Sequence, residues 1–279
     1  MSPARVAGVI GYPVEHSLSP ALHNAAYAAL GLDWCYHAFD VAPGELAAAV
    51  AGARALGLRG LSVTMPHKEE AAALADRRSA AARRLAACNT LVFETSGTLA
   101  ESTDGEGFLA DLREEAAFDP AGKTCAVIGA GGAARAVILA LAEAGAGQLL
   151  VINRTTVNAF RAAAVGRGRA RVAREAELEG ADLVVQATPV GMGALEGATR
   201  FPADPRHLGS GQLVVDLVYS PALTEFLSEA ARNGARVRNG LGMLVRQAGL
   251  QVSLFTGAPA PLEAMWAAVG GKEAATRPS

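Results

Sequence analysis

The sequence predicts an α/β fold in two domains, and three observations carry this prediction. The chain has 279 residues, and at roughly 150 residues per domain this length favours two domains. Short apolar runs alternate with helical segments along most of the chain, which is the pattern of βαβ units with parallel strands. One apolar run leads directly into a glycine-rich turn that opens a helix, as in dinucleotide-binding folds.

The first hundred residues alternate between predicted strands and helices. Ser19-Pro20 is expected to open the first helix, because serine caps helices and proline suits the first turn. Gly97 separates two short apolar runs and predicts a hairpin. In order, the predicted elements are strand 5–11, helix 19–30, strand 34–41, helix 43–56, strand 59–64, helix 69–87 and hairpin strands 90–93 and 99–101.

The second half repeats the order strand, turn, helix, strand. The segment from Arg167 to Arg174 holds four arginines, and we interpret it as a solvated loop and sheet edge because the whole chain has a net charge of −2. The predicted elements are a linking helix 105–117, strands 123–128, 148–153, 182–187 and 213–218, and helices 134–144 and 243–256.

Composition and charge argue against several classes of protein. A net charge of −2 and a pI near 6.2 are unlike a general nucleic-acid binder, which needs a basic excess, and give no reason to expect an anionic membrane as partner. No segment reads as a membrane-spanning helix or a signal peptide. The three cysteines are widely spaced without a CxxC pair, so we expect no disulfide framework, no metal site and a reducing, cytoplasmic setting.

Lysine is rare in this chain. Of its 25 basic residues 22 are arginine, and the lysines are Lys68, Lys123 and Lys272. Lysine can lose its proton at accessible pH, whereas arginine effectively cannot. Lys68 and Lys123 are therefore candidates for chemistry, while Lys272 lies in a polar tail.

The glycine-rich turn predicts a dinucleotide site. Gly129-x-Gly131-x-x-Ala134 follows a predicted strand and opens a helix, in which the first glycine allows the tight turn and the second lets the backbone approach a pyrophosphate. The positive end of the helix then faces the phosphates. The alternative is a packing turn without a ligand.

The end of the next strand favours NADP over NAD. An NAD enzyme usually places an acid there to hold the ribose 2′-hydroxyl, but this chain has Asn153-Arg154-Thr155. Arginine pairs with a 2′-phosphate, which an acid would repel. The alternative is that Arg154 is a plain surface residue.

A set of small polar residues follows the strands of the first domain, where ligands of open α/β sheets bind. Its members are Ser17, Ser19, Thr64, Lys68, Asn89 and Asp104. Each has a structural alternative: helix cap, turn residue or solvated side chain. His16, His23 and His67 lie near the same segments; a histidine base is chemically reasonable, although such histidines are more often structural.

Several motifs occur together in one order. They are Gly11-Tyr-Pro-Val-Glu-His-Ser-Leu-Ser-Pro20 with His23-Asn24, Ser62-Val-Thr-Met-Pro-His-Lys68, Cys88-Asn-Thr90, Ser102-Thr-Asp-Gly105, the glycine turn, Asn153-Arg-Thr155, Asp216-Leu-Val-Tyr219 and Asn239-Gly-Leu-Gly-Met-Leu-Val-Arg-Gln247. Jointly they resemble the shikimate dehydrogenase family over nearly the whole chain.

The resemblance implies an N-terminal α/β domain that binds shikimate, over residues 1–104 plus about 240–279. It also implies a Rossmann-like NADP-binding domain over about 105–239, with the C-terminal helix returning to the first domain. The reaction implied is the reversible NADPH-linked reduction of 3-dehydroshikimate to shikimate, a step of chorismate and aromatic amino-acid biosynthesis.

The resemblance also implies roles for single residues. Ser17 and Ser19 would donate to the substrate carboxylate, with support from Tyr219. Thr64, Asn89 and Gln247 would bind ring hydroxyls, and Lys68 and Asp104 would be the catalytic pair beside the hydroxyl that is oxidised. The residues expected to bind the cofactor are Gly129, Ala130, Gly131, Gly132, Ala133, Asn153, Arg154, Thr155, Asn158, Leu217 and Gly240.

Two positions depart from the family pattern. Many members carry a second arginine where this chain has Asn158, and the two arginines together clamp the 2′-phosphate. One arm of this clamp is therefore missing here unless Arg161 or Arg135 supplies it. Leu217 replaces a frequent methionine, a swap of similar size.

Two other functions stay open at this point. One is an NAD-dependent quinate/shikimate dehydrogenase, although relatives that accept quinate often have threonine where this chain has Ser19. The other is a shikimate-binding protein without turnover, which would be expected to have lost Lys68 or Asp104. The sequence does not give the oligomeric state, and a homodimer is compatible with it.

Overall fold

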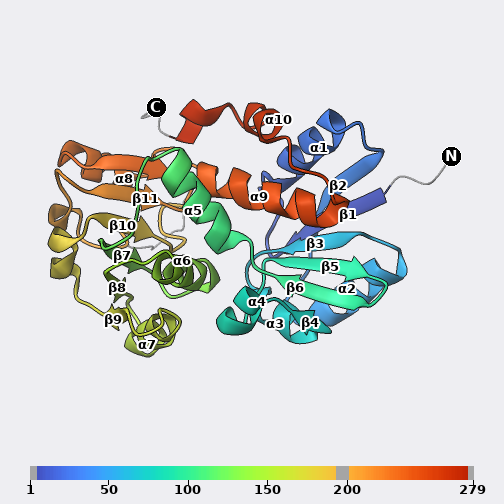
Figure 1. Ribbon diagram of the computed structural model, residues 1–279, viewed down its shortest axis with the longest axis horizontal. Coiled ribbons are helices and arrows are strands. Elements are labelled where there is room, and N and C mark those ends of the chain that lie inside the picture. The colour runs from blue at the N-terminus through green and yellow to red at the C-terminus, as the bar shows by residue number, and fades with distance from the viewer. Residues whose placement is uncertain (1–4, 193–200, 276–279) are drawn as a thin grey trace. The chain divides into compact units, whose positions relative to one another are not determined.

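The computed structural model describes residues 5–192 and 201–275. The chain forms two compact units (Figure 1). The first comprises residues 1–107 and 245–271, and the second residues 108–244 and 272–279. The limits differ from the predicted ones by a few residues, except that Lys272–Ala275 groups with the second unit. There the Lys272 ammonium donates to Glu115 at 2.8 Å, and the Ala274 carbonyl accepts from Asn239 at 2.9 Å.

The first unit contains a six-stranded sheet in the order β2-β1-β3-β5-β6-β4. The pairs β1–β2, β1–β3 and β4–β6 are parallel, and β3–β5 and β5–β6 are antiparallel. The strands are β1 Arg5–Gly11, β2 Trp34–Asp40, β3 Gly60–Val63, β4 Arg77–Arg78, β5 Thr90–Glu94 and β6 Gly97–Glu101; the helices are α1 Ser19–Ala29, α2 Leu46–Ala55, α3 Lys68–Leu74, α4 Ala80–Leu85 and α10 Leu262–Ala267. The chain passes from one unit to the other within two further helices, α5 Asp104–Glu114 and α9 Leu241–Thr256.

Both faces of this sheet are covered by helices. Successive side chains of a strand point to opposite faces, and β3 shows the consequence. Leu61 and Val63 join a buried cluster with residues of α2, α3 and α4, whereas Ser62 between them bonds to Gln251 of α9. The face of the sheet near α9 is therefore the one that carries buried polar residues.

The second unit contains a parallel sheet in the order β12-β11-β10-β7-β8-β9. The chain order reverses between β7 and β10, and open α/β sheets bind ligands beyond the carboxyl ends of the strands at such a point. The strands are β7 Thr124–Ile128, β8 Gln148–Ile152, β9 Ala170–Val172, β10 Leu183–Gln186, β11 Leu213–Asp216 and β12 Arg236–Asn239; the helices are α6 Gly132–Glu143, α7 Thr156–Ala164 and α8 Glu225–Arg232, with 3₁₀ turns η1 Glu175–Gly180, η2 Pro205–His207 and η3 Lys272–Ala275.

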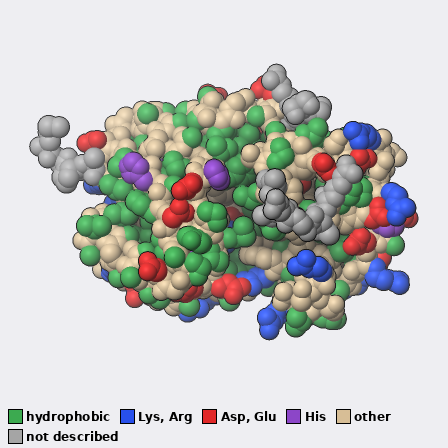
Figure 2. Space-filling model, turned by 180° about the vertical axis from the view of Figure 1, so that it is seen from behind, with side chains coloured by type: hydrophobic (Ala, Val, Ile, Leu, Met, Phe, Trp, Pro, Cys, Tyr) green, Lys and Arg blue, Asp and Glu red, His purple; other side chains and the backbone are tan. Residues whose placement is uncertain are grey.

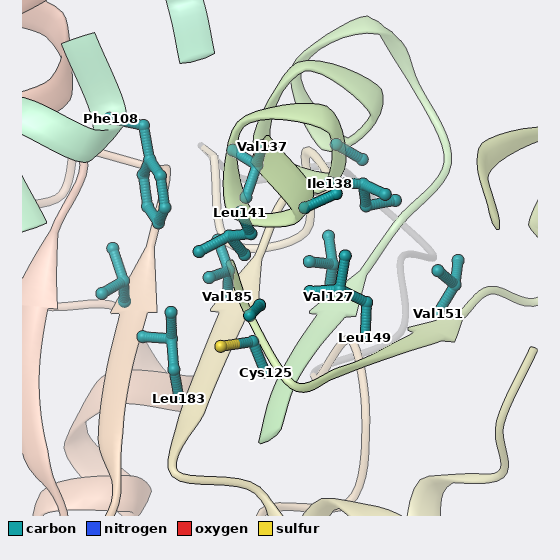
Figure 3. Close-up of a cluster of buried hydrophobic side chains, with 14 of the residues drawn as sticks. Phe108, Cys125, Val127, Val137, Ile138, Leu141, Leu149, Val151, Leu183 and Val185 are labelled. Atoms are coloured by element: carbon teal, nitrogen blue, oxygen red, sulfur yellow. The ribbon is translucent and has the colours of Figure 1, made fainter. Parts of the chain in front are cut away.

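The core of the second unit forms on both faces of its sheet. On one face Val127, Val185 and Leu149 pack against Val137 and Leu141 of α6 (Figure 3). The alternate residues of the same strands form a separate cluster with residues of α8 and η1. Because the strands are buried on both sides, they read as continuous apolar runs, which is why the sequence identifies them.

The predicted helix over 69–87 is wrong. The structure has α3, then the short strand β4, then α4. The Asp76 carboxylate accepts the backbone N–H of Thr98 at 2.6 Å, which draws the chain to the edge of the sheet beside β6. The Ser79 hydroxyl then caps α4 by accepting from the Ala82 N–H at 3.1 Å. Tertiary contacts thus interrupt a segment whose alanine content favours one helix.

The other predicted elements are present, with ends that differ from the predicted ones by at most three residues. The structure adds α7, β9, α8, β12 and α10, for which no separate element was predicted. In the described residues, 5–192 and 201–275, no helix is both long enough and apolar enough to cross a membrane. On the face shown in Figure 2, basic side chains lie interspersed with acidic, apolar and neutral ones.

Candidate functional site

The first unit contains a largely buried ion pair. The Lys68 ammonium lies 2.5 Å from Oδ2 of Asp104, and the two side chains are 17% and 9% exposed. Lys68 is the first residue of α3, and Asp104 is the first residue of α5, where the helix dipole favours a negative charge. Burial makes a charge costly unless it is paired and hydrogen-bonded. The two charges are therefore held together by their surroundings, and Lys68 is not a solvated surface lysine.

Asn89 connects this pair to its surroundings. Its amide nitrogen donates to Asp104 Oδ1 and to Thr103 Oγ1, each at 2.8 Å, and lies 3.2 Å from Gln247 Oε1. Its amide oxygen accepts from the Thr103 N–H and the Thr90 hydroxyl, each at 2.9 Å. Asn89 is thus the centre of a buried polar cluster, which goes beyond the role of a turn residue.

Helix α9 brings Gln247 to this cluster through a close approach to α5. A Cβ added to Gly107 would lie 2.6 Å from the backbone nitrogen of Gln247. Gln247 is 7% exposed. Only glycine at position 107 lets the two helices approach so closely, and this contact sets the reach of Gln247 toward Asn89.

Ser17 and Ser19 are adjacent at the start of α1. The Ser19 N–H donates to the Ser17 hydroxyl at 3.2 Å. The expectation that Ser19 caps α1 is wrong, because Leu18 occupies the cap position and no side-chain cap is formed. The Ser19 hydroxyl has no hydrogen-bond partner among the described residues, and the serine pair is thereby available to a ligand.

Thr64 follows β3 and lies against the end of β1. Its N–H donates to the Ile10 carbonyl at 2.9 Å. A Cβ added to Gly11 would lie 2.4 Å from Thr64 Cγ2. The glycine that ends β1 therefore makes room for the Thr64 side chain.

The histidines near these segments have structural positions or lie at the surface. His67 is buried and its Nε2 lies 2.7 Å from the Val41 carbonyl. His23 is fully buried, stacks on Tyr36 at 3.9 Å between ring centroids, and donates from Nδ1 to the Ser19 carbonyl at 2.9 Å. Burial lowers the pKa of His23 to about 4, although the bond to Ser19 opposes the shift. His16 is exposed.

In the second unit the glycine turn follows β7 as predicted. Gly129 has a φ of +124°, and a Cβ there would lie 2.7 Å from the Ala187 carbonyl oxygen. Gly131 is the cap residue of α6 without a side-chain cap, and no atom lies within 4 Å of a Cβ added to it. The helix start is therefore open to a ligand, with N–H groups that no capping side chain occupies. Ala130, Gly132 and Ala133 complete the turn and are half-buried.

The end of β8 carries Asn153, Arg154 and Thr155. The Asn153 amide donates to the Thr155 carbonyl at 3.0 Å, and Thr155 is the cap residue of α7. Arg154 and Asn158 are both exposed. A basic side chain at this strand end suits an anionic group.

Gly240 and Leu217 contact one another through the backbone. A Cβ added to Gly240 would lie 2.1 Å from the Leu217 carbonyl oxygen, and the Gly240 N–H donates to the Val218 carbonyl at 3.1 Å. The close approach of the Leu217 backbone is therefore enough to explain why position 240 requires glycine.

Asp216 holds the turn after β11 that leads to Tyr219. Its carboxylate is fully buried and accepts from Thr224 Oγ1 at 2.7 Å, from the Val218 N–H at 3.0 Å and from Gln186 Nε2 at 3.2 Å. Burial raises the pKa of Asp216 to about 6, against the effect of these hydrogen bonds. The Asp216 carboxylate therefore stabilises the turn through these three hydrogen bonds.

The sequence is similar to known proteins along most of its length. Residues 9–91 match the family model described as shikimate dehydrogenase substrate binding domain, and residues 240–269 match the one described as shikimate 5′-dehydrogenase C-terminal domain. A shikimate dehydrogenase (NADP(+)) of Moorella thermoacetica is 46% identical, over 95% of both chains.

The chain belongs to the shikimate dehydrogenase family.

Solved structures of this family have the same fold. A crystal structure of a shikimate dehydrogenase in complex with NADP+ superposes with a TM-score of 0.89 at 35% identity over 96% of both chains. The Thermus thermophilus enzyme in complex with NADP(H) and shikimate gives 0.86 at 35% identity, over 95% of this chain and 98% of that one. The two-domain α/β fold predicted from the sequence is thereby confirmed.

The structure joins four of the family's predicted site residues by direct contacts: Lys68, Asp104, Asn89 and Gln247. Three further members of the cluster were not singled out from the sequence, namely Thr90, Thr103 and Gln251. The spacing of four between Gln247 and Gln251 places both on one helix face and is the one sequence signal that points to Gln251.

We expect acid to destabilise the protein through His23. Protonation would place a charge and an unpartnered donor at Nε2, which is buried and has no hydrogen-bond partner in the described residues. A pKa of about 4 when folded, against 6.5 for the ordinary group, means that the unfolded chain binds the proton first as the pH falls through 6.5. The resulting loss of unfolding free energy grows until about pH 4 and reaches roughly 2 kcal/mol at pH 5.

Urea unfolding of His23→Gln and wild type at pH 7 and pH 5 measures this loss. The wild type should lose about 2 kcal/mol more than the variant between the two values, and replacement of the exposed His37 should change nothing. Equal losses for wild type and His23→Gln would show that His23 is not the acid-sensitive group.

Proposed function

We propose that this protein catalyses the reversible NADPH-linked reduction of 3-dehydroshikimate to shikimate, a step of chorismate and aromatic amino-acid biosynthesis. The observation that carries the proposal is the buried pair of Lys68 and Asp104, bound to Asn89. A protein that only binds shikimate has no need of a buried ion pair, which costs free energy to desolvate. The naming of the relatives as shikimate dehydrogenase (NADP(+)) supports the same activity.

We assign the substrate to the first unit. The Ser17 and Ser19 hydroxyls would donate to the carboxylate of shikimate, where neutral donors suffice because hydrogen bonds to a charge are the stronger kind. Tyr219 would support them, as the resemblance to the family implies. Thr64, Asn89 and Gln247 would bind the ring hydroxyls.

The proton chemistry is assigned to Lys68 and Asp104. Oxidation of an alcohol removes a hydride from carbon and a proton from oxygen, and the pair would accept that proton as a unit and return it in the reduction. Asp104 Oδ1 is already bound by Asn89 and Oδ2 by Lys68, so the carboxylate holds the ammonium in one direction. NADP+, when bound, supplies the hydride acceptor.

The second unit fits NADP. The open backbone at Gly131 and the uncapped start of α6 suit the pyrophosphate,. Arg154 is exposed just after β8, where it would pair with a 2′-phosphate, and residues 153–158 include no carboxylate. Asn158 replaces the second basic arm, so Arg154 would carry most of the discrimination between NADP and NAD, with Arg161 or Arg135 as the substitute arm.

We also propose a cytoplasmic location. Cys35, Cys88 and Cys125 are free thiols, and burial raises the pKa of Cys88 and of Cys125 to about 12. Free, protonated thiols suit a reducing compartment.

The test is an assay at 340 nm with shikimate and quinate, each with NADP+ and with NAD+. Turnover confined to shikimate with NADP+ would support substrate and cofactor together. Quinate turnover with NAD+ would overturn the assignment and implicate Asn158. Silence in all four assays, with shikimate still bound, would show a protein without turnover.

Replacement of Lys68 should slow the chemical step. We expect Lys68→Ala to lower kcat by roughly 10²–10⁴-fold, the range of general acid–base catalysis, with little change in KM for shikimate. Lys123→Ala is the matched control, because this half-exposed lysine pairs with Asp182 in the second unit. A kcat retained by Lys68→Ala would exclude the proton-transfer role.

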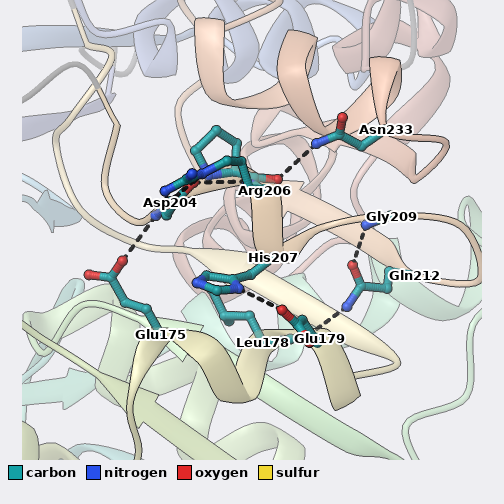
Figure 4. Close-up of polar contacts among 10 residues, drawn as sticks. Glu175, Leu178, Glu179, Asp204, Arg206, His207, Gly209, Gln212 and Asn233 are labelled. Atoms are coloured by element: carbon teal, nitrogen blue, oxygen red, sulfur yellow. Dashed lines mark hydrogen bonds and ion pairs between the residues drawn. The ribbon is translucent and has the colours of Figure 1, made fainter.

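Replacement of Arg154 should affect one cofactor. Charged hydrogen bonds contribute about 1.5–3 kcal/mol, so Arg154→Ala should raise the KM for NADP+ by about tenfold or more and leave the KM for NAD+ unchanged. Arg206→Ala, which removes an exposed guanidinium bound to Asp204 (Figure 4), is the control. An equal loss with both cofactors would show that Arg154 does not bind the 2′-phosphate.

A further inference from the structure

Behind the polar cluster of the first unit lies a continuous line of buried hydrogen bonds that ends at Lys68. Its centre is Gln251 of α9, which is 1% exposed. The Gln251 amide oxygen accepts from the Ser62 hydroxyl at 2.7 Å. Its amide nitrogen donates to the Asn89 carbonyl at 3.1 Å and to the Thr90 hydroxyl at 2.9 Å. Every hydrogen-bonding group of this side chain thus has a partner.

The donors and acceptors along this line have one consistent direction. Because Gln251 donates to Thr90 Oγ1, the single hydroxyl proton of Thr90 is left to donate to Asn89 Oδ1. The Asn89 amide then has its oxygen toward Thr90 and its nitrogen toward Asp104 Oδ1. The other oxygen of Asp104 binds the Lys68 ammonium.

The orientation of the Asn89 amide depends on the groups around it. Its amide nitrogen has two protons but three acceptors within reach, those of Thr103, Asp104 and Gln247. A rotated amide would place its oxygen against the Asp104 carboxylate, and two acceptors would then face each other. In the productive orientation the Asn89 amide oxygen accepts from the Thr103 N–H and from the Thr90 hydroxyl, each at 2.9 Å. The Thr90 hydroxyl adds to this preference only while its own proton points at Asn89.

The other end of the line is anchored in the sheet and α1. The Tyr36 hydroxyl donates to Ser62 Oγ at 2.5 Å, which leaves the Ser62 proton free to reach Gln251. Tyr36 is fully buried under the His23 ring. This line of hydrogen bonds, the relay from Tyr36 to Lys68, therefore takes its direction from the Tyr36 hydroxyl, which is buried and cannot donate to water instead.

We propose that Gln251 is a positioning residue of the reaction: through Thr90 it orients the amide of Asn89, and through Asn89 it holds Asp104 and Lys68. This role rests on the proposed function. Gln251 itself acts only through its neighbours. Its amide is required because the position needs an acceptor for Ser62 and a donor for Thr90 in one side chain, which neither methionine nor glutamate provides.

The experiment compares steady-state oxidation of shikimate by wild type and two kinds of variant. Gln251→Met removes the relay's centre at similar volume, and Thr90→Val removes its middle member almost isosterically. Each should lower kcat/KM for shikimate by roughly tenfold, the value of a buried hydrogen bond, while the KM for NADP+ stays the same. Thr90→Ser retains the hydroxyl and should lose much less than Thr90→Val.

Gln212→Met is the matched control. Gln212 is also buried and makes three hydrogen bonds, donating to Leu178 and Ala181 and accepting from Gly209 in the second unit (Figure 4). Gln212→Met should cost stability without lowering kcat/KM for shikimate. An equal loss of kcat/KM in both glutamine variants would overturn the proposal in favour of a general effect of destabilisation.

The double variant Gln251→Met, Thr90→Val separates a relay from two independent effects. Members of one network are not additive, so the double variant should be no worse than the poorer single one. A loss equal to the product of the two single losses would overturn the relay. If Gln251→Met does not fold, the comparison of Thr90→Val with Thr90→Ser decides alone, and equal kcat/KM values would refute the proposal. An inactive wild type would instead refute the proposed function.

Discussion

The burial of the Lys68–Asp104 pair is the constraint on which the first unit depends. Two charges removed from water lose several kcal/mol of solvation each, and they persist only where geometry and hydrogen bonds compensate. Asp104 receives that compensation from the start of α5, from Asn89 and from Lys68. The cluster therefore requires three separate segments of the chain to meet with hydrogen-bond accuracy.

Gly107 and helix α9 together make this meeting of segments possible. Gly107 lets α5 approach the backbone of α9, and α9 then supplies Gln247 and Gln251 on one face, four residues apart. The same principle acts in the second unit, where Gly129 and Gly240 permit backbone contacts that a Cβ would block. These glycines, which read as ligand motifs in the sequence, are thus also packing residues, whereas Gly131 has open space above it.

Sequence reasoning was accurate where local chemistry decides the structure. The apolar strands, the glycine turn and the hairpin at Gly97 follow from short patterns, and they are present. It was wrong where a distant group decides. Ser19 does not cap α1, and residues 69–87 are broken by Asp76, which bonds to Thr98 of another strand. A local pattern cannot report a partner 22 residues away.

The sequence by itself determined the fold class, the family and the residue types at the candidate site, because motifs preserve which side chains are needed. The tertiary structure decided how those side chains are held. It alone shows that Asn89 has more acceptors than protons, and that Thr90 and Gln251 lie behind it. These partners are up to 162 residues apart in the chain. Hydrogen-bond direction depends on atoms brought together by packing, and no spacing in the sequence encodes it.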